Sequence, residues 1–273
     1  GLGDRYTKTI INGIDIPGLD PDRNTFQMDI LPTNIIDNII VHKSFSPELP
    51  AEFTGGVIDI SLKDFPEQKK GNIFFSAGYN PDFHFSSEYL SYKGGKTDFL
   101  GFDDGTRKIP ATINLPFFTD VVGKPLDSEQ SIRYREVLEG FNPTMAAMKQ
   151  MSFMDYNFGT SMGNQVALKK AILGYNFRFS YKSTTEFYKD AEYGRYGLSG
   201  DHDITEMEVR EFQKGNFGVN SVLVSGLAGF AIKTLKSKYR INLLHLQNGE
   251  SKAGIFNYKS SDLGTIFEGF QHN

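Results

Sequence analysis

The 273-residue sequence contains no cysteine and no tryptophan. Without cysteine these residues cannot form a disulfide, a thiolate metal site or a cysteine nucleophile. A long apolar run is missing too, because a membrane-spanning helix needs about 18 or more mostly apolar residues. The best candidate, residues 222–232, is much shorter and is interrupted by Ser225, Gly226 and Gly229. The absences therefore exclude a disulfide scaffold and predict no helical membrane span.

Positive charge is also scarce. The 29 Lys and Arg residues are outnumbered by 33 Asp and Glu residues, so the net charge is −4, and the pI is about 5.8. A general nucleic-acid binder is expected to be basic, so this composition argues against that class of protein. The mean hydropathy of −0.36 is typical of a soluble acidic protein, and the acidity is concentrated in residues 1–64.

Residues 1–64 are patterned as a small α+β unit with several short strands. Thr9–Ile11 runs into Asn12-Gly13, a turn dipeptide that tolerates positive φ. The pattern then predicts a short helix over residues 34–38 and a buried strand over residues 39–41. Gly55-Gly56 precedes a further strand over residues 57–62.

Residues 65–70 break the apolar pattern and are predicted to be a linker, after which the pattern changes. Over residues 171–182, aromatic and aliphatic side chains alternate with a second set comprising Asn176, Arg178, Ser180 and Lys182. This alternation predicts a strand of unusual length with one apolar and one polar face. Two structures fit it: a long sandwich strand with one wet face, or a transmembrane barrel strand with its polar side chains facing the lumen.

Other segments favour the barrel. Residues 72–79, 152–165, 206–232 and 238–250 also read as extended, which gives about five strands, and only residues 127–150 look helical. The connection at residues 233–237 is brief, while residues 184–205 and 248–273 are charged and contain glycine. Short connections at one end and long loops at the other are typical of outer-membrane barrels.

Tests for chemistry are negative. Gly94-Gly95-Lys96-Thr97 lacks the earlier glycine of a phosphate-binding loop and is predicted to be a tight loop. Asp20 and Asp22 have the opening spacing of a calcium loop, but the required glycine and glutamate are absent. The five histidines are dispersed. The sequence therefore predicts no enzyme, no metal site and no cofactor.

Several segments resemble one family, the TonB-dependent outer-membrane receptors. The likeness to the second half of a plug domain is carried by Gly1–Tyr6 with Arg5, by Asn12-Gly13, by Asp20–Arg23, by Asp29–Pro32, and by Phe53–Ile60 with Gly55 and Gly56. Tyr92–Arg107 and Phe141–Thr144 resemble a long loop after the first barrel strand in a large subgroup. One departure is Ile40-Val41, where family plugs commonly place a glutamate before the valine.

The resemblance implies that residues 1–64 are the C-terminal half of a plug, 65–70 a linker, and 71–273 the first strands of a barrel of about 22 strands with long extracellular loops. Five strands cannot close in lipid, so we expect the chain to be part of a larger polypeptide. The resemblance further implies a Gram-negative outer membrane, TonB as a partner through a segment not present here, and contact with membrane lipid.

Three functions follow as hypotheses. The first is a transporter that imports a siderophore, glycan or peptide, with Asp20, Asp22 and Arg23 as candidate ligand contacts and mobile polar contacts between plug and wall. The second is an outer-membrane assembly or secretion component, or a platform for a surface lipoprotein or other complex partner. The third is a secreted β-rich enzyme or carbohydrate-binding protein, which the hydropathy allows.

Overall fold

The computed structural model describes residues 7–16, 31, 35–44, 46–49, 56–63, 66–110, 117–144, 146–198, 207–260 and 264–272. Most of these residues lie in strands, so the prediction of a mainly β chain with antiparallel sheets is confirmed, and no sheet formed by them is closed. The chain divides into two compact units. The first comprises Gly1–Ala77, Tyr156–Lys182 and Leu223–Asn248, and the second comprises Gly78–Asp155, Ser183–Val222 and Gly249–Asn273.

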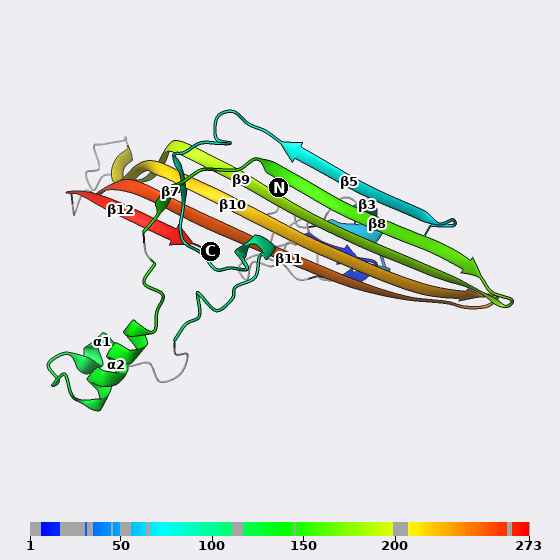
Figure 1. Ribbon diagram of the computed structural model, residues 1–273, viewed down its shortest axis with the longest axis horizontal. Helices are drawn as coiled ribbons and strands as arrows, with labels where there is room; N and C mark the ends of the chain where they lie inside the picture. Colours follow the sequence, from blue (N-terminus) through cyan, green and yellow to red (C-terminus); the bar gives the residue numbers. More distant parts are fainter. Residues whose placement is uncertain are drawn as a thin grey trace. The chain divides into compact units, whose positions relative to one another are not determined.

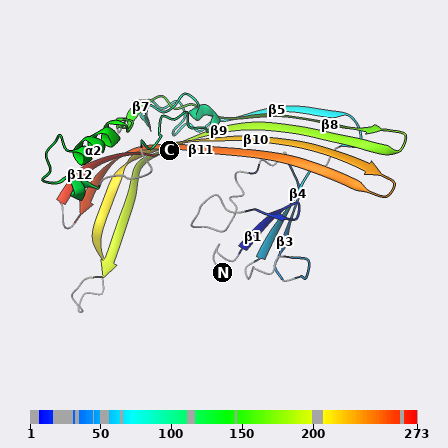
Figure 2. The ribbon, with the colours of Figure 1, turned by 90° about the horizontal axis from the view of Figure 1, so that it is seen from below.

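Four short strands form an N-terminal sheet within the first unit (Figure 2). They are β1 (Thr7–Ile11), β2 (Ile14–Asp15), β3 (Ile36–His42) and β4 (Gly56–Leu62), in the order β2-β1-β4-β3. The β1–β2 turn is the predicted Asn12-Gly13, with φ of 51° and 81°. The Asn12 side chain also accepts a hydrogen bond from the Leu62 amide at 3.0 Å, which ties the turn to β4.

The prediction for residues 34–41 is wrong in two respects. Residues 36–38 belong to β3 rather than to a helix, because antiparallel pairing with β4 supplies their backbone partners. Ile39, Ile40 and Val41 form a strand as expected, but their side chains are exposed. The physical reason is that, among the described residues of β3, Ile36 packs against the apolar cluster that contains Ile60 and Leu62, while residues 39–41 lie outside that cluster.

Six strands form the large sheet (Figure 1). They are β5 (Lys70–Gly78), β8 (Asp155–Ala167), β9 (Ala171–Leu198), β10 (Met207–Thr234), β11 (Lys238–Ser260) and β12 (Gly264–His272), in the order β12-β11-β10-β9-β8-β5. Within this sheet, strands that follow one another along the chain therefore lie side by side. The alternating segment over residues 171–182 is the start of β9, and both β9 and β10 are 28 residues long.

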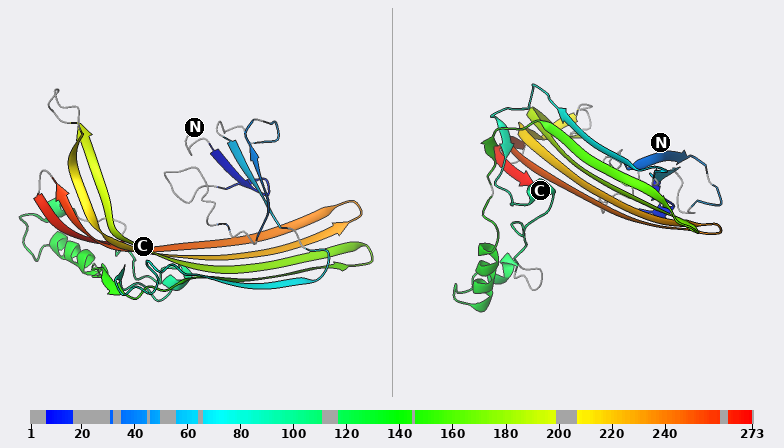
Figure 3. Two further views of the ribbon diagram at one scale, coloured as in Figure 1. Left: turned by 90° about the horizontal axis from the view of Figure 1, so that it is seen from above. Right: turned by 45° about the vertical axis from the view of Figure 1, so that its right-hand side comes forward.

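Two segments predicted to be loops are mostly strand. Residues 184–198 continue β9, and residues 249–260 and 264–272 belong to β11 and β12, as Figure 3 shows. Their charged residues misled the prediction, and two of those in residues 184–198 pair with charges on the neighbouring strand. Lys214 on β10 contacts Glu192 on β9 at 2.9 Å, and Arg195 contacts Glu211 at 3.1 Å. The extra strand β12 makes six strands instead of about five.

The segment between β5 and β8 holds the remaining elements. These are β6 (Tyr89–Ser91), a 3₁₀ turn (Asp98–Leu100), α1 (Phe118–Val121), α2 (Glu129–Glu139) and β7 (Met148–Gln150), which pairs with β6. Residues 127–150 were predicted to be helical, and α2 covers part of them. Its N-cap is Ser128, whose side chain accepts a hydrogen bond from the Ser131 amide. Residues 148–150, at the end of the predicted range, form β7 instead. No helix among the described residues is long and apolar enough to cross a membrane.

Candidate functional site

Strand β9 separates two chemically different faces within the first unit. Phe177 and Phe179 are 38% and 40% exposed, while Asn176 and Ser180, on the opposite side, are 3% and 5% exposed. We call the side of Asn176 the inner face and the side of Phe177 the outer face of the large sheet. Polar residues are usually the exposed ones, so these four residues reverse the usual arrangement, whereas the next two residues follow it, with Tyr181 buried and Lys182 exposed.

Asn176 connects the inner face to the end of the N-terminal sheet. Its Nδ2 donates a hydrogen bond to the Lys63 carbonyl at 3.2 Å, although the two residues are 113 positions apart. The Lys63 amide in turn donates to the Ile35 carbonyl at 2.9 Å. Gly229 on β10 makes room for this side chain, because a Cβ there would lie 2.5 Å from Asn176 Oδ1.

The other predicted inner-face residues lie in different environments. Ser180 contacts Ser225 of β10 through their hydroxyls at 2.8 Å, and both side chains are buried. Arg178 is half-buried, and Lys182 is exposed. The four residues therefore share the face that their alternation predicted, but they do not form one polar cluster.

Leucines of the inner face pack against the N-terminal sheet. Leu227 of β10 is buried in one cluster with Ile11, Ile60 and Leu62, and Leu223, Leu244 and Leu246 pack around it. Sequence reasoning expected mobile polar contacts between these two parts, and this cluster corrects that expectation. The sequence did contain a sign of this apolar contact, because β10 and β11 carry leucines at inner-face positions as well as apolar residues at outer-face positions.

Of the remaining predicted site residues, only some are described. Arg5, Asp20, Asp22, Arg23 and Gly55 lie outside the described residues. Asn12 and Gly13 form the β1–β2 turn. Gly56 begins β4 with a φ of 147°, which favours glycine, and a Cβ there would lie 3.2 Å from the His42 carbonyl oxygen.

The segment 92–107 folds into a compact loop around Arg107. The guanidinium donates to both Asp98 carboxylate oxygens, at 2.9 and 2.6 Å, and to the Tyr92 hydroxyl at 3.0 Å. These hydrogen bonds raise the pKa of Arg107, and the bond to Asp98 has the largest effect. Gly94 is required because a Cβ there would overlap the Asp98 carboxylate. The prediction of a tight loop is confirmed.

Asp104 holds the other side of the same loop. Its carboxylate accepts hydrogen bonds from the Thr106 hydroxyl and from the Lys96 amide, the latter at 2.8 Å. These bonds, led by that from Thr106, lower the pKa of Asp104 to about 2. The loop is thus held by an ion pair and by carboxylate-to-backbone hydrogen bonds.

A buried histidine in the second unit was not singled out by its sequence context. His84 Nδ1 accepts from the Asn80 amide at 2.9 Å, so Nε2 carries the proton and faces the Thr185 carbonyl at 3.2 Å and Asp155 at 3.3 Å. Asp155 also accepts from the Thr185 amide at 2.8 Å. Every polar atom of the ring has a partner, which is typical of a structural histidine.

No group of three or more His, Asp or Glu side chains suited to a metal ion occurs in the described part of the chain. The arrangement found here instead joins two sheets through an apolar cluster and a side chain-to-backbone hydrogen bond. No protein-family model, curated protein or solved structure matches the chain.

Proposed function

We propose that the chain is part of a TonB-dependent transporter of a Gram-negative outer membrane. In this proposal the N-terminal sheet belongs to a plug, and the large sheet is a section of the surrounding barrel wall. The supporting observation is the reversed polarity in the middle of β9, where Phe177 and Phe179 are exposed while Asn176 and Ser180 are buried, and where Asn176 donates a hydrogen bond to the Lys63 carbonyl. A hydrocarbon environment stabilises exposed aromatic and aliphatic side chains, and water does not.

Strand length agrees with this proposal. A 28-residue strand has a contour length of about 90 Å at roughly 3.3 Å per residue, and a tilted strand needs only about 9–11 residues to cross a bilayer. Strands β9 and β10 would therefore project well beyond the membrane. The cross-strand ion pairs at Glu192 and Glu211 lie in the part nearest the β9–β10 connection, where water would surround them.

The mechanism requires that the plug be held until energy arrives. The Leu227 cluster and the hydrogen bond from Asn176 to Lys63 hold the N-terminal sheet against the wall. TonB would act on the plug, and its work would separate these contacts. The ligand would be a siderophore, a glycan or a peptide, with Asp20, Asp22 and Arg23 as its candidate contacts in the plug. The proposal involves no enzyme activity and no cofactor.

The test has two parts, both using the intact protein. Membrane fractionation should place it in the outer membrane, and release should require detergent. Uptake of candidate ligands should be lost when TonB is deleted. A protein that stays monomeric and soluble without detergent would instead support the secreted β-rich enzyme or carbohydrate-binding protein.

A second candidate function, a platform for a surface lipoprotein or another complex partner, is favoured by one observation. Residues 117–141 expose several large apolar side chains, including Phe117, Phe118 and Leu126. Large apolar side chains exposed together often mark a site of protein–protein interaction. The test is copurification. A stable complex that is lost on replacing Phe117, Phe118 and Leu126 by serine would support the platform, and ligand uptake without a partner would contradict it.

A further inference from the structure

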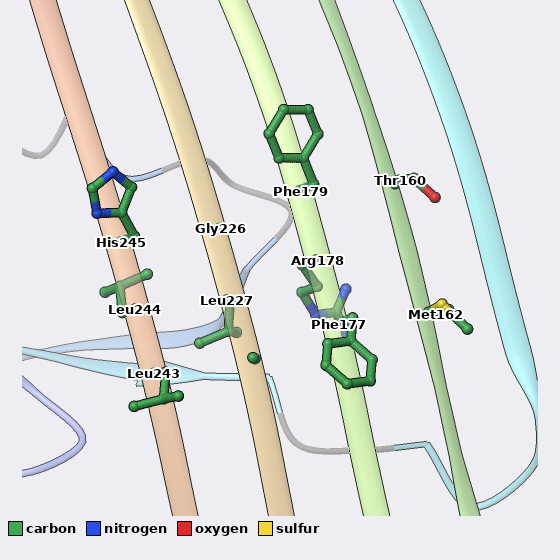
Figure 4. A pocket seen from close by; sticks show the side chains of 11 residues that line it. Thr160, Met162, Phe177, Arg178, Phe179, Gly226, Leu227, Leu243, Leu244 and His245 are labelled. Atoms are coloured by element: carbon green, nitrogen blue, oxygen red, sulfur yellow. The ribbon is translucent and has the colours of Figure 1, made fainter. Parts of the chain in front are cut away.

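The outer face of the large sheet contains a hollow in the first unit. Its floor is β10 at Gly226 and Ala228, where the side chains are missing or small, and Figure 4 shows the residues around it. One wall is formed by Phe177 and Phe179 of β9, and the other by Leu243 and His245 of β11. The hollow has a volume of about 480 Å³. A Cβ added to Gly226 would meet no atom within 4 Å, so the space above the glycine is open.

The two ends of the hollow differ in polarity. Met162, Phe177 and Leu243 lie at the end nearer the short turns at residues 168–170 and 235–237. Thr160 and His245 lie at the other end, on the same level as Phe179 (Figure 4). Arg178 also lines the hollow, but its side chain belongs to the inner face of β9. The outer-face side chains are therefore apolar at one end of the hollow and include hydrogen-bonding groups at the other.

We propose that this hollow seats one acyl chain of a membrane phospholipid. The chain would lie along β10 over Gly226 and Ala228, with its end toward Leu243 and its ester region toward His245 and Thr160. The inference rests on the proposed membrane location, and it adds a defined lipid site to a surface that would otherwise contact lipid uniformly.

The width of the hollow admits an acyl chain but not a helix. Strands β9 and β11 flank β10 and so lie about 10 Å apart, and their side chains narrow the space between them further. A helix with its side chains measures about 10–12 Å across and cannot enter. The outer face around the hollow is also apolar and exposed, at Ile73, Phe75 and Ile241 among others. A hydrocarbon chain therefore passes from this face into the hollow without crossing a polar rim.

The test is photocrosslinking of the intact protein in phosphatidylcholine vesicles that contain a phospholipid with a diazirine near the end of one acyl chain. Peptides carrying residues 177–179 and 243–245 should be labelled more than the peptide carrying Ile73 and Phe75. Gly226→Leu fills the hollow without a backbone clash and should lower labelling of the first two peptides about tenfold. That factor corresponds to losing the contacts of one buried aliphatic side chain.

Gly71→Leu is the matched control. Gly71 lies on β5 in the same alternation as Ile73, is exposed, and has room for a Cβ, so this variant should leave the labelling unchanged. Equal labelling of all three peptides, or labelling that Gly226→Leu does not lower, overturns the lipid site while leaving the membrane proposal intact. A polypeptide crosslinked at the hollow also overturns it. Absence of labelling from all three peptides contradicts the membrane location itself.

Discussion

Replacement of Leu227 by alanine tests whether the apolar cluster holds the N-terminal sheet to the inner face. Leu227 is 3% exposed and packs among Ile11, Ile60 and Leu62. Truncating a buried leucine costs about 2–5 kcal/mol. Because Leu227 lies where two sheets meet and the space can partly close, we expect about 2 kcal/mol. At about 1.4 kcal/mol per factor of ten, the separated state should become about 30-fold more populated.

Thiol labelling measures this population directly. Ser225 lies between Leu223 and Leu227 on the inner face and is 1% exposed, so a cysteine there reacts with maleimide only when the sheets separate. The 273 residues contain no other cysteine. The labelling rate of the Ser225→Cys protein is the reference. When the sheets close again faster than maleimide reacts, the labelling rate follows the population of the separated state, so adding Leu227→Ala should raise it about 30-fold.

Leu243→Ala is the control, because Leu243 lies on the outer face of the adjacent strand and is 62% exposed. It should change the labelling rate by less than about twofold, as is usual for surface substitutions. Circular dichroism at the same temperature distinguishes local separation from loss of the large sheet. A Leu227→Ala rate equal to the reference, or an equal increase with Leu243→Ala, would refute the reasoning.

Three further predictions concern the hydrogen bond to Lys63 and the loop at residues 92–107. Gly229→Ala should displace Asn176 and raise the same labelling rate about tenfold, through loss of a buried hydrogen bond worth about 1–2 kcal/mol, whereas Gly226→Ala, with open space at its Cβ, should not. Arg107→Lys removes the bidentate contact with the Asp98 carboxylate, so limited proteolysis should cut this loop faster than in the unchanged protein. Arg107→Ala should be cut at least as fast as Arg107→Lys. Because the pKa of Asp104 is lowered from 3.8 to about 2, its carboxylate stabilises the folded loop above pH 4, and this contribution is lost as the pH falls from about 4 to about 2. Exchange of the Lys96 amide, corrected for its intrinsic rate, should therefore accelerate over that range, and Asp104→Asn should abolish the pH dependence.

Local patterns predicted the strands of this protein well. The alternation over residues 171–182 identified β9 and separated Asn176 and Ser180 from Phe177 and Phe179, because side chains on a strand alternate between two faces regardless of what covers each face. The Asn12-Gly13 turn was recognisable for the same reason, since its backbone geometry depends on two adjacent residues.

Long charged segments were harder to assign. Residues 184–198 and 249–260 were predicted to be loops because charges and glycines weaken a strand prediction. They are strands because their backbones pair with neighbouring strands, as residues 252–260 do with β12. Charges such as Lys214 and Glu192 then meet across the sheet. Such a pairing depends on register, which a single strand's own sequence does not reveal.

The sequence by itself determined that the chain is mainly β, that β9 has an apolar and a polar face, and that residues 94–97 form a tight loop. Only the tertiary structure decided how the polar face is covered. Asn176 meets Lys63 across 113 residues, and Leu227 joins a cluster built largely from the first 62 residues. Alternation records which side a residue faces, but the free energy of burial depends on the surface it meets, and that surface comes from elsewhere in the chain.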